Sequence, residues 1–176
     1  MSAHEPSSHE HHHRKGAPIS VATCVITVSD TRTLESDTGG GLVVQLLADA
    51  GHEIVSREIV KDDAESIAAA VRAALSLQGS GAVILTGGTG VAPRDVTPES
   101  VEPFLERLVP GFGELFRMLS YEDIGSAAVL SRALAGLAKG RVVFVIPGSR
   151  GAVRLAMDKL ILPELAHLAG EAVKTS

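Results

Sequence analysis

The sequence is poor in aromatic residues, cysteine and positive charge. Only 3% of its 176 residues are aromatic and none is tryptophan, so we do not expect aromatic side chains to stack on nucleic acid bases. The formal net charge of -5 argues against nonspecific binding to nucleic acid or to an anionic membrane, because both need a basic surface. Cys24 is the single cysteine, which excludes a disulfide within the chain and favours a small buried core residue.

Long apolar runs are also missing. No stretch approaches the roughly 20 apolar residues of a membrane-spanning helix, and the first residues lack the apolar segment of a signal peptide. We therefore expect a cytoplasmic protein with no membrane partner. Residues 1–17 hold five of the seven histidines and show no apolar period, so we expect a disordered tail, with weak transition-metal binding as the alternative. Residues 18–176 are expected to form one domain, since 45% of the chain is hydrophobic.

Short β-branched runs alternate with apolar stripes at helical spacing over most of the chain. This alternation predicts an α/β fold in which helices cover both faces of a mostly parallel sheet, a three-layer α/β/α sandwich. The last two predicted strands are joined at Ala138-Lys139-Gly140, a turn-like break typical of a hairpin, which makes the central sheet mixed. The predicted strands cover residues 21–28, 54–60, 82–86, 132–137 and 141–146.

Three helices are predicted in the first two thirds of the chain. Apolar residues recur at helical spacing from Leu42 onward, after a long polar loop that ends in three glycines. A second stripe follows Asp63, which is a suitable N-cap. Thr97 followed by Pro98 has the pattern of an N-cap with proline at the first helical position, and the apolar residues that follow predict a helix continuing to Leu108.

Two more helices are predicted toward the end of the chain. One covers residues 111–121, with Leu115, Met118 and Leu119 expected to face the core. The other follows residue 149, and we expect it to bend at Pro163.

A glycine-rich loop between the third strand and the third helix has the composition of an anion site. Gly87, Gly88 and Gly90 leave backbone N–H groups uncovered, as in loops that wrap phosphate, and the helix after the loop directs its positive end toward it. Asp95 in the same loop would repel a phosphate unless a divalent cation stood between them. We therefore infer a magnesium ion. The alternative, left open, is that Asp95 caps a turn or pairs with Arg94.

Polar side chains follow four of the predicted strands, at the edge of an open α/β sheet where ligands bind. Carboxylates from two strand ends, glycine loops and arginines fit a phosphate-bearing ligand with a divalent metal. No Walker motif, spaced dinucleotide fingerprint or Ser-His-Asp set is present, which leaves phosphoryl or nucleotidyl transfer as the expected chemistry. The polar clusters are Ser29, Asp30 and Arg32 after the first strand, Asp62 and Asp63 after the second, residues 87–95 after the third, and Pro147-Gly148-Ser149 after the last.

From about residue 18 to the end, the chain resembles the MoaB/Mog family of molybdenum cofactor biosynthesis proteins, also called the molybdopterin-binding domain. In combination and in this order the shared motifs are highly specific. They are Ser29-Asp30, Asp37-Thr38-Gly39-Gly40, Thr86-Gly87-Gly88-Thr89-Gly90, Pro93-Arg94-Asp95-Val96-Thr97-Pro98-Glu99, Pro110-Gly111-Phe112-Gly113-Glu114, Ser131-Arg132 and Pro147-Gly148-Ser149.

The resemblance implies the molybdopterin-binding fold and a molybdopterin adenylyltransferase. In that reaction the terminal phosphate of molybdopterin attacks the α-phosphate of ATP and pyrophosphate leaves, with Mg²⁺ required. The resemblance also implies catalytic and metal-binding roles for Asp62 and Asp95, with Asp63 as the alternative to Asp62. It implies a homotrimer and contacts with other molybdenum cofactor enzymes. The residues expected to bind cofactor or substrate are Ser29, Asp30, Asp37, Gly39, Gly40, Thr86, Gly87, Gly88, Thr89, Gly90, Pro147, Gly148 and Ser149.

A second hypothesis stays open beside catalysis. Residues 116–125 look more like the MoaB branch than the Mog branch, and Lys61 and Arg150-Gly151 stand where the family often has proline. These features motivate a non-catalytic molybdopterin-binding or assembly protein of the same pathway. The role of Arg132 is also open, because it could reach a phosphate or a neighbouring subunit.

Overall fold

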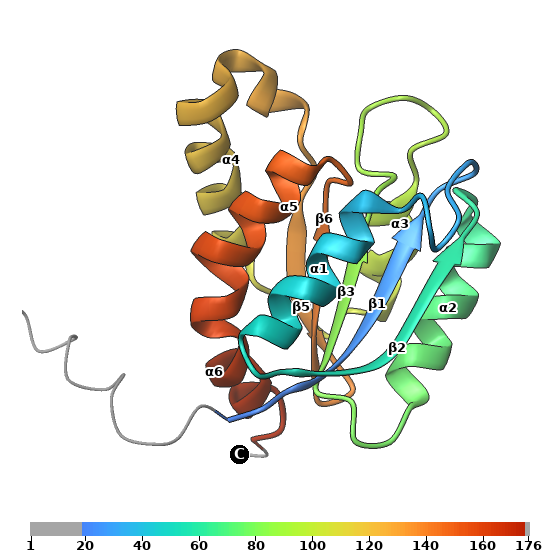
Figure 1. Cartoon of the computed structure of the whole chain (residues 1–176), viewed down its shortest axis with the longest axis vertical. Coiled ribbons are helices and arrows are strands. Elements are labelled where there is room, and N and C mark those ends of the chain that lie inside the picture. The colour runs from blue at the N-terminus through green and yellow to red at the C-terminus, as the bar shows by residue number, and fades with distance from the viewer. Residues whose placement is uncertain (1–18, 175–176) are drawn as a thin grey trace, which may run out of the picture.

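The computed structural model describes residues 19–174, and the predicted tail lies outside this range. Six strands form one mixed sheet in the order β2-β1-β3-β6-β5-β4 (Figure 1). The first four strands in that order are parallel and the last two pair antiparallel. The predicted α/β fold class and the hairpin between the last two predicted strands are confirmed. The strands are β1 (Ala22–Val28), β2 (Glu53–Val60), β3 (Ala82–Thr86), β4 (Arg107–Leu108), β5 (Leu134–Ala138) and β6 (Arg141–Ile146).

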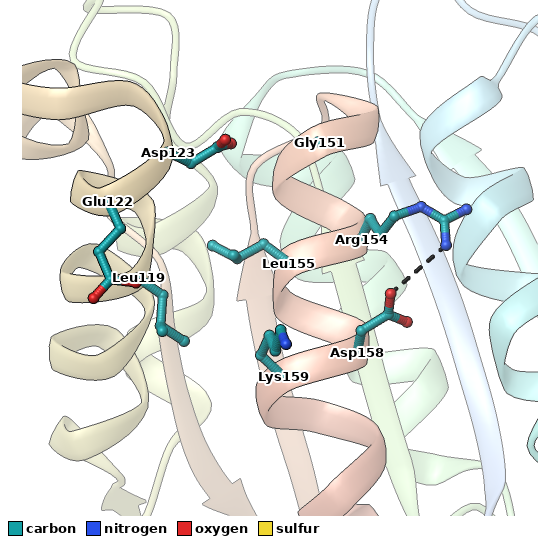
Figure 2. Close-up of a pocket in the computed structure, with 8 residues that line it drawn as sticks. All are labelled: Leu119, Glu122, Asp123, Gly151, Arg154, Leu155, Asp158 and Lys159. Carbon is teal, nitrogen blue, oxygen red and sulfur yellow. Dashed lines mark ion pairs between the residues drawn. The ribbon is translucent and has the colours of Figure 1, made fainter.

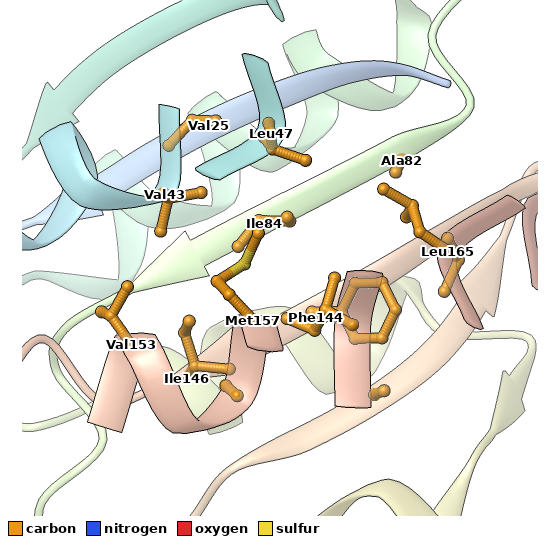
Figure 3. Close-up of a cluster of buried hydrophobic side chains, with 14 of the residues drawn as sticks. Val25, Val43, Leu47, Ala82, Ile84, Phe144, Ile146, Val153, Met157 and Leu165 are labelled. Carbon is orange, nitrogen blue, oxygen red and sulfur yellow. The ribbon is translucent and has the colours of Figure 1, made fainter. Parts of the chain in front are cut away.

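Helices cover both faces of the sheet because the central strands are apolar on both sides. On one face, Val25, Ile84 and Phe144 of the strands pack against α1 and the C-terminal helices (Figure 3). On the other face, Cys24 and Ile26 pack against α2 and α3. No helix within residues 19–174 combines the length and the apolar character needed to span a bilayer. The helices are α1 (Thr38–Asp49), α2 (Ala64–Ser76), α3 (Thr97–Val101), α4 (Pro110–Ile124), α5 (Arg150–Ala156) and α6 (Leu162–Ala172).

The helical segment at the end of the chain is irregular near Pro163, where a bend was expected. A π-helical stretch (Met157–Ile161) joins α5 to α6, and Pro163 lies in the first turn of α6. Residues 150–172 are helical without a break, so Pro163 removes one N–H donor from within this run. Helices bend at such π-bulges as well as at proline.

The prediction of one helix from Thr97 to Leu108 is wrong. Helix α3 ends at Val101, a 3-10 turn (Glu102–Phe104) follows, and Leu108 lies in the short edge strand β4. Pro103 supplies no N–H to continue α3, and after the 3-10 turn the backbone becomes extended at Leu105 (φ -80°, ψ 120°). Thr97 is the first residue of α3 and not its cap. The N-cap is Val96, which makes no side-chain hydrogen bond.

The predicted inward face of α4 is wrong for Leu115 and Met118, whereas Leu119 is half-buried. Phe112 and Phe116 are buried and stack with each other, and Phe112 also meets Phe144 at 5.2 Å between ring centroids. Leu115 and Met118 are instead 46% and 53% exposed. Helix α4 carries apolar side chains on two sides, and the aromatic side fits the core better because it buries more apolar area. The second side faces solvent.

Candidate functional site

The carboxyl ends of four parallel strands meet at one edge of the sheet. Backbone hydrogen bonds join them just beyond the strand ends: Ser29 donates to Val60 O at 2.9 Å and Gly87 donates to Ile146 O at 3.0 Å. The backbone N–H of Asp62 donates to Asp30 Oδ1 at 3.1 Å. The four polar clusters that the sequence places after the strands therefore lie together at this edge, which we call the rim.

A small cavity of about 120 Å³ opens at the rim beside the N-terminus of α1. Pockets for complete drug-sized ligands usually have about 300–1,000 Å³, so this one fits a phosphate-sized group. Its walls come from the ends of β1, β3 and β6 and from the start of α1. The lining residues are Thr27, Val28, Ser29, Arg32, Asp37, Thr38, Gly39, Thr86, Gly87 and Gly148.

Asp37 builds the N-terminus of α1 behind this cavity. Its buried carboxylate accepts hydrogen bonds from Gly40 N at 2.9 Å and from the Thr27 hydroxyl at 2.7 Å, and it forms an ion pair with Arg57 at 3.3 Å. The glycines that the sequence pattern assigns to a loop are thus the first turn of α1. A Cβ on Gly40 would lie 2.2 Å from Thr27 Oγ1, so only glycine allows this close packing. Arg57 was missed because it lies inside the apolar pattern of β2.

The glycine loop after β3 needs glycine for two reasons. Gly87 and Gly88 have φ values of +101° and +61°, which residues other than glycine rarely adopt. A Cβ on Gly87 would also lie 2.3 Å from Val28 O, and a Cβ on Gly88 would lie 2.2 Å from Thr97 Oγ1. The loop therefore passes against the end of β1 and the start of α3 with no room for side chains. The Gly87 N–H already donates to Ile146 O, and the Gly88 carbonyl accepts from Thr97 N at 3.0 Å, so these two groups are not free for a ligand.

Asp62 presents its carboxylate to the same loop. A Cβ on Gly88 would lie 2.8 Å from Asp62 Oδ1, and this oxygen is buried without a hydrogen-bond partner. Burial raises the pKa of the Asp62 carboxyl, and the charges of Asp95 and Asp30 raise it further, although the backbone N–H of Val96 opposes the rise. A buried carboxylate oxygen without a partner is costly unless a ligand supplies one.

Asp63 is turned away from the rim and caps α2. Both of its carboxylate oxygens accept hydrogen bonds from Ser66, one from the backbone N–H and one from the hydroxyl, each at 2.8 Å. These bonds lower the pKa of the Asp63 carboxyl. Of the two neighbouring acids, Asp62 is therefore the one that borders the loop, and the predicted N-cap role of Asp63 is confirmed.

Asp95 lies on the other side of the glycine loop. Its Oδ2 accepts a hydrogen bond from Ala92 N at 3.1 Å, and a Cβ on Gly90 would lie 2.6 Å from the same oxygen. The turn-capping alternative is therefore present in the structure. This hydrogen bond occupies one of the two carboxylate oxygens, and the charge of Asp95 still acts on Asp62.

The remaining predicted site residues shape the rim. Ser29 Oγ accepts hydrogen bonds from two backbone N–H groups of the turn after β1. Ser149 caps α5 through Ala152 N at 3.3 Å, and the Thr86 hydroxyl donates to Pro147 O at 3.5 Å. Thr89 is buried within the loop. These contacts position backbone groups around the cavity.

Asp62 and Asp95 have the donor set that Mg²⁺ uses. Within residues 19–174, no three His, Cys, Asp or Glu side chains gather into a complete metal-binding group. Magnesium, however, is usually held by one or two carboxylates, with waters and substrate phosphates completing its shell. Asp62 and Asp95 fit such an ion. The two carboxylates repel each other beside one glycine loop, and Asp62 Oδ1 is buried without a partner.

A second hollow, of about 530 Å³, lies between α4 and α5 (Figure 2). Its walls carry Glu122 and Asp123 from α4, with Arg154 and Lys159 across from them. Arg154 pairs with Asp158 at 3.6 Å along the helix. None of the site residues predicted from the sequence lines this hollow, so it is separate from the rim.

Known proteins match this chain over nearly its full described length. The family model described as a probable molybdopterin binding domain matches residues 24–167. Molybdenum cofactor biosynthesis protein B of Bacillus cereus is 55% identical over 160 residues, which cover 90% of this chain and 95% of that protein. A crystal structure of a molybdenum cofactor biosynthesis protein B has a TM-score of 0.87 at 54% identity, covering 89% of this chain and 98% of the other.

A more distant relative has the same fold. The tungsten cofactor synthesizing protein MoaB from Pyrococcus furiosus has a TM-score of 0.80 at 37% identity, covering 90% of this chain and all (100%) of that one. The sheet order, the rim and these matches agree, and the chain belongs to the molybdopterin-binding domain family, whose MoaB/Mog members are molybdenum cofactor biosynthesis proteins.

Proposed function

We propose that this protein adenylylates molybdopterin with Mg-ATP in molybdenum cofactor biosynthesis. One observation carries the proposal: Asp62 and Asp95 border the same glycine loop, and Asp62 Oδ1 is buried without a partner beside it. The phosphate-sized cavity opens on the same rim. A phosphate site next to a pair of metal-binding carboxylates supports transfer between two phosphate-bearing substrates.

The cavity would receive the terminal phosphate of molybdopterin. The N-terminus of α1 would direct the N–H groups of its first two residues and the positive end of the helix dipole at the phosphate, while Gly40 N and Gly41 N already donate to Asp37. Gly39, Gly87 and Gly148 bring their backbones close because they lack side chains. These groups would hold the phosphate through some of its oxygens. They leave one oxygen free to act as the nucleophile.

The two carboxylates would serve the nucleotide. Bound Mg²⁺ supplies charge neutralisation for the triphosphate. The attacking oxygen of molybdopterin forms a bond to the α-phosphorus of ATP, the bond from that phosphorus to the bridging oxygen breaks, and pyrophosphate leaves with the electron pair. No protein nucleophile is needed, since positioning and electrostatic stabilisation are sufficient for this class of reaction.

The direct test is product formation by the purified chain with molybdopterin, ATP and Mg²⁺. We expect adenylylated molybdopterin and pyrophosphate in equal amounts, and neither without the metal. If both substrates bind and no product forms above background, the proposal is wrong.

The second candidate is a molybdopterin-binding or assembly protein without turnover. Arg150 begins α5 directly after Ser149 of the rim, where its positive charge can bind substrate phosphate, whereas the charge of Lys61 acts on Asp63. Saturable molybdopterin binding without product would support this candidate. Turnover that Asp95→Asn abolishes while molybdopterin affinity is kept would exclude it.

For the assembly we propose a homotrimer, with a second copy of this chain covering the exposed side of α4. The 3-10 helix η3 (Gly125–Leu130) extends this apolar surface, which we call the α4–η3 face. The neighbouring hollow carries Glu122 and Asp123 of α4, and Arg154 and Lys159 of the helical segment 150–161 (Figure 2). Copies could therefore pair opposite charges beside an apolar contact. A cytoplasmic location and contacts with other enzymes of the pathway stay predictions. The face carries Leu115, Met118, Tyr121, Ile124, Val129 and Leu130.

A further inference from the structure

Arg132 binds the glycine loop, although it lies far from this loop in the sequence. It lies just before β5, and Gly90 is 42 residues away in the sequence. Its Nε donates to Gly90 O at 2.8 Å, its Nη2 donates to Asp95 O at 2.5 Å, and its Nη1 binds the carboxylate of Glu99. One guanidinium thus joins the start of the 90–95 segment, its end and the first turn of α3.

The segment is closed on its other side by Asp95 itself. The Asp95 carboxylate folds back over Gly90 and accepts the hydrogen bond from Ala92 N. The guanidinium of Arg132 holds the carbonyls of Gly90 and Asp95 in one plane, since its donors form a rigid fork. The position of the Asp95 carboxylate therefore depends on these contacts.

The contacts of Arg132 matter because the segment carries one of two neighbouring carboxylates. Asp62 lies beside Gly88 and Asp95 lies beside Gly90 of the same loop. Two carboxylates that are to share one ion repel each other when the ion is absent. Contacts that hold the segment in place keep the two carboxylates ready to share one ion.

We propose that Arg132 is a positioning residue that fixes Asp95 opposite Asp62 for the metal–nucleotide complex. The inference rests on the proposed function. Each of the three nitrogens of Arg132 already donates to a protein acceptor, which favours this role over the direct phosphate or subunit contact that the sequence left open. A lysine has one nitrogen and cannot reach three acceptors that lie in different directions.

The test measures metal–nucleotide affinity apart from turnover. Binding of Mn²⁺ in the presence of ATP is followed through the electron paramagnetic resonance signal of free Mn²⁺, in the native chain and in Arg132→Ala and Arg132→Lys. We expect both variants to bind Mn²⁺–ATP about 10- to 100-fold more weakly and to need correspondingly more Mg²⁺ for turnover. Molybdopterin affinity should be unchanged.

Arg141→Ala is the matched control. Arg141 also donates to two backbone carbonyls, Lys139 O at 2.6 Å and Leu77 O at 2.8 Å, but it begins β6 at the opposite edge of the sheet. It should leave Mn²⁺–ATP affinity unchanged. Glu99→Ala removes the acceptor of Arg132 Nη1, so it tests the same set of contacts if Arg132→Ala fails to fold. Its loss of affinity should be smaller than that of Arg132→Lys.

The outcomes separate this inference from the proposed function. Native affinity in a folded Arg132→Ala overturns the inference, even if the native chain turns over. Full rescue by Arg132→Lys also overturns it, because charge alone would then be sufficient. Native affinity in Glu99→Ala counts against it in the same way. Binding of Mn²⁺–ATP by the native chain without product contradicts the proposed function alone, and no binding at all overturns both.

Discussion

Asp62 and Gly88 are in contact: a Cβ placed on Gly88 would stand 2.8 Å from Asp62 Oδ1, an oxygen that is buried and has no hydrogen-bond partner. The contact joins the end of β2 to the loop after β3, although β1 lies between these strands in the sheet. An acid and a phosphate-type loop from separate parts of the chain therefore share one surface. The proposed adenylyl transfer requires the acid and the loop to share this surface.

The first prediction concerns Gly88→Ala. The new methyl group would lie 2.2 Å from Thr97 Oγ1 and 2.8 Å from Asp62 Oδ1, and the φ of +61° is unfavourable for alanine. We expect a lower melting temperature and loss of most turnover. Gly170→Ala in α6 is the control, since nothing lies within 4 Å of its Cβ position, and it should raise the free energy of unfolding by up to about 1 kcal/mol. Native turnover in Gly88→Ala would contradict the account of the loop.

The second prediction concerns the pH dependence of stability in Asp62→Asn. The folded-state pKa of Asp62 is raised from 3.8, so its ionised form opposes folding. The stability it contributes is present at low pH and is lost as pH rises through the folded-state pKa. Without metal, Asp62→Asn should match the native chain at low pH and be more stable at neutral pH, while turnover falls. Thermal melts over a pH series measure this, and equal stability of both chains at neutral pH would count against it.

The third prediction concerns Asp63→Ala, which is compared with Asp62→Asn because the two acids are neighbours in the sequence. Asp63 caps α2 through Ser66 and does not border the loop. The variant should melt at a lower temperature, because a helix N-cap is lost, and should keep native turnover per folded molecule. If turnover falls as far as in Asp62→Asn, the assignment of Asp62 over Asp63 is wrong.

Much of the fold was predictable from local patterns. The strands β1, β3 and β6 are short apolar runs bounded by glycine or polar residues, and they lie where predicted. Helix α4 could not be oriented from its sequence, because apolar side chains recur on two sides and periodicity alone does not choose between them. The end of α3 could not be predicted from apolar spacing, because this spacing continues past Pro103 to Leu108.

The site was predictable to the extent that topology decides it. Parallel strands end on one edge, so Asp62 and the glycine loop were expected to meet there. The contacts of Arg132 with the glycine loop and the support of Asp37 by Arg57 were not predictable. Both join a side chain to groups far away in the sequence, and such contacts leave no local pattern.

The fourth prediction concerns the α4–η3 face. Met118 is 53% exposed on this face, and we expect Met118→Lys to dissociate the proposed trimer by placing a charge in its apolar contact. Val173→Lys is the control, because Val173 is 65% exposed outside the face, and it should remain trimeric. Sedimentation equilibrium measures both. A monomeric native chain, or a trimer that Met118→Lys leaves intact, would contradict the proposed interface.

The most direct measurement of the central claim is adenylylated molybdopterin formed by Asp95→Asn beside the native chain, over a range of Mg²⁺ concentrations. The amide oxygen of Asn can still accept the hydrogen bond from Ala92 N, so the loop should keep its fold and its molybdopterin affinity. The account predicts Mg²⁺-dependent product from the native chain and a rate about 100- to 1,000-fold lower in the variant. Equal rates in the two chains would contradict it.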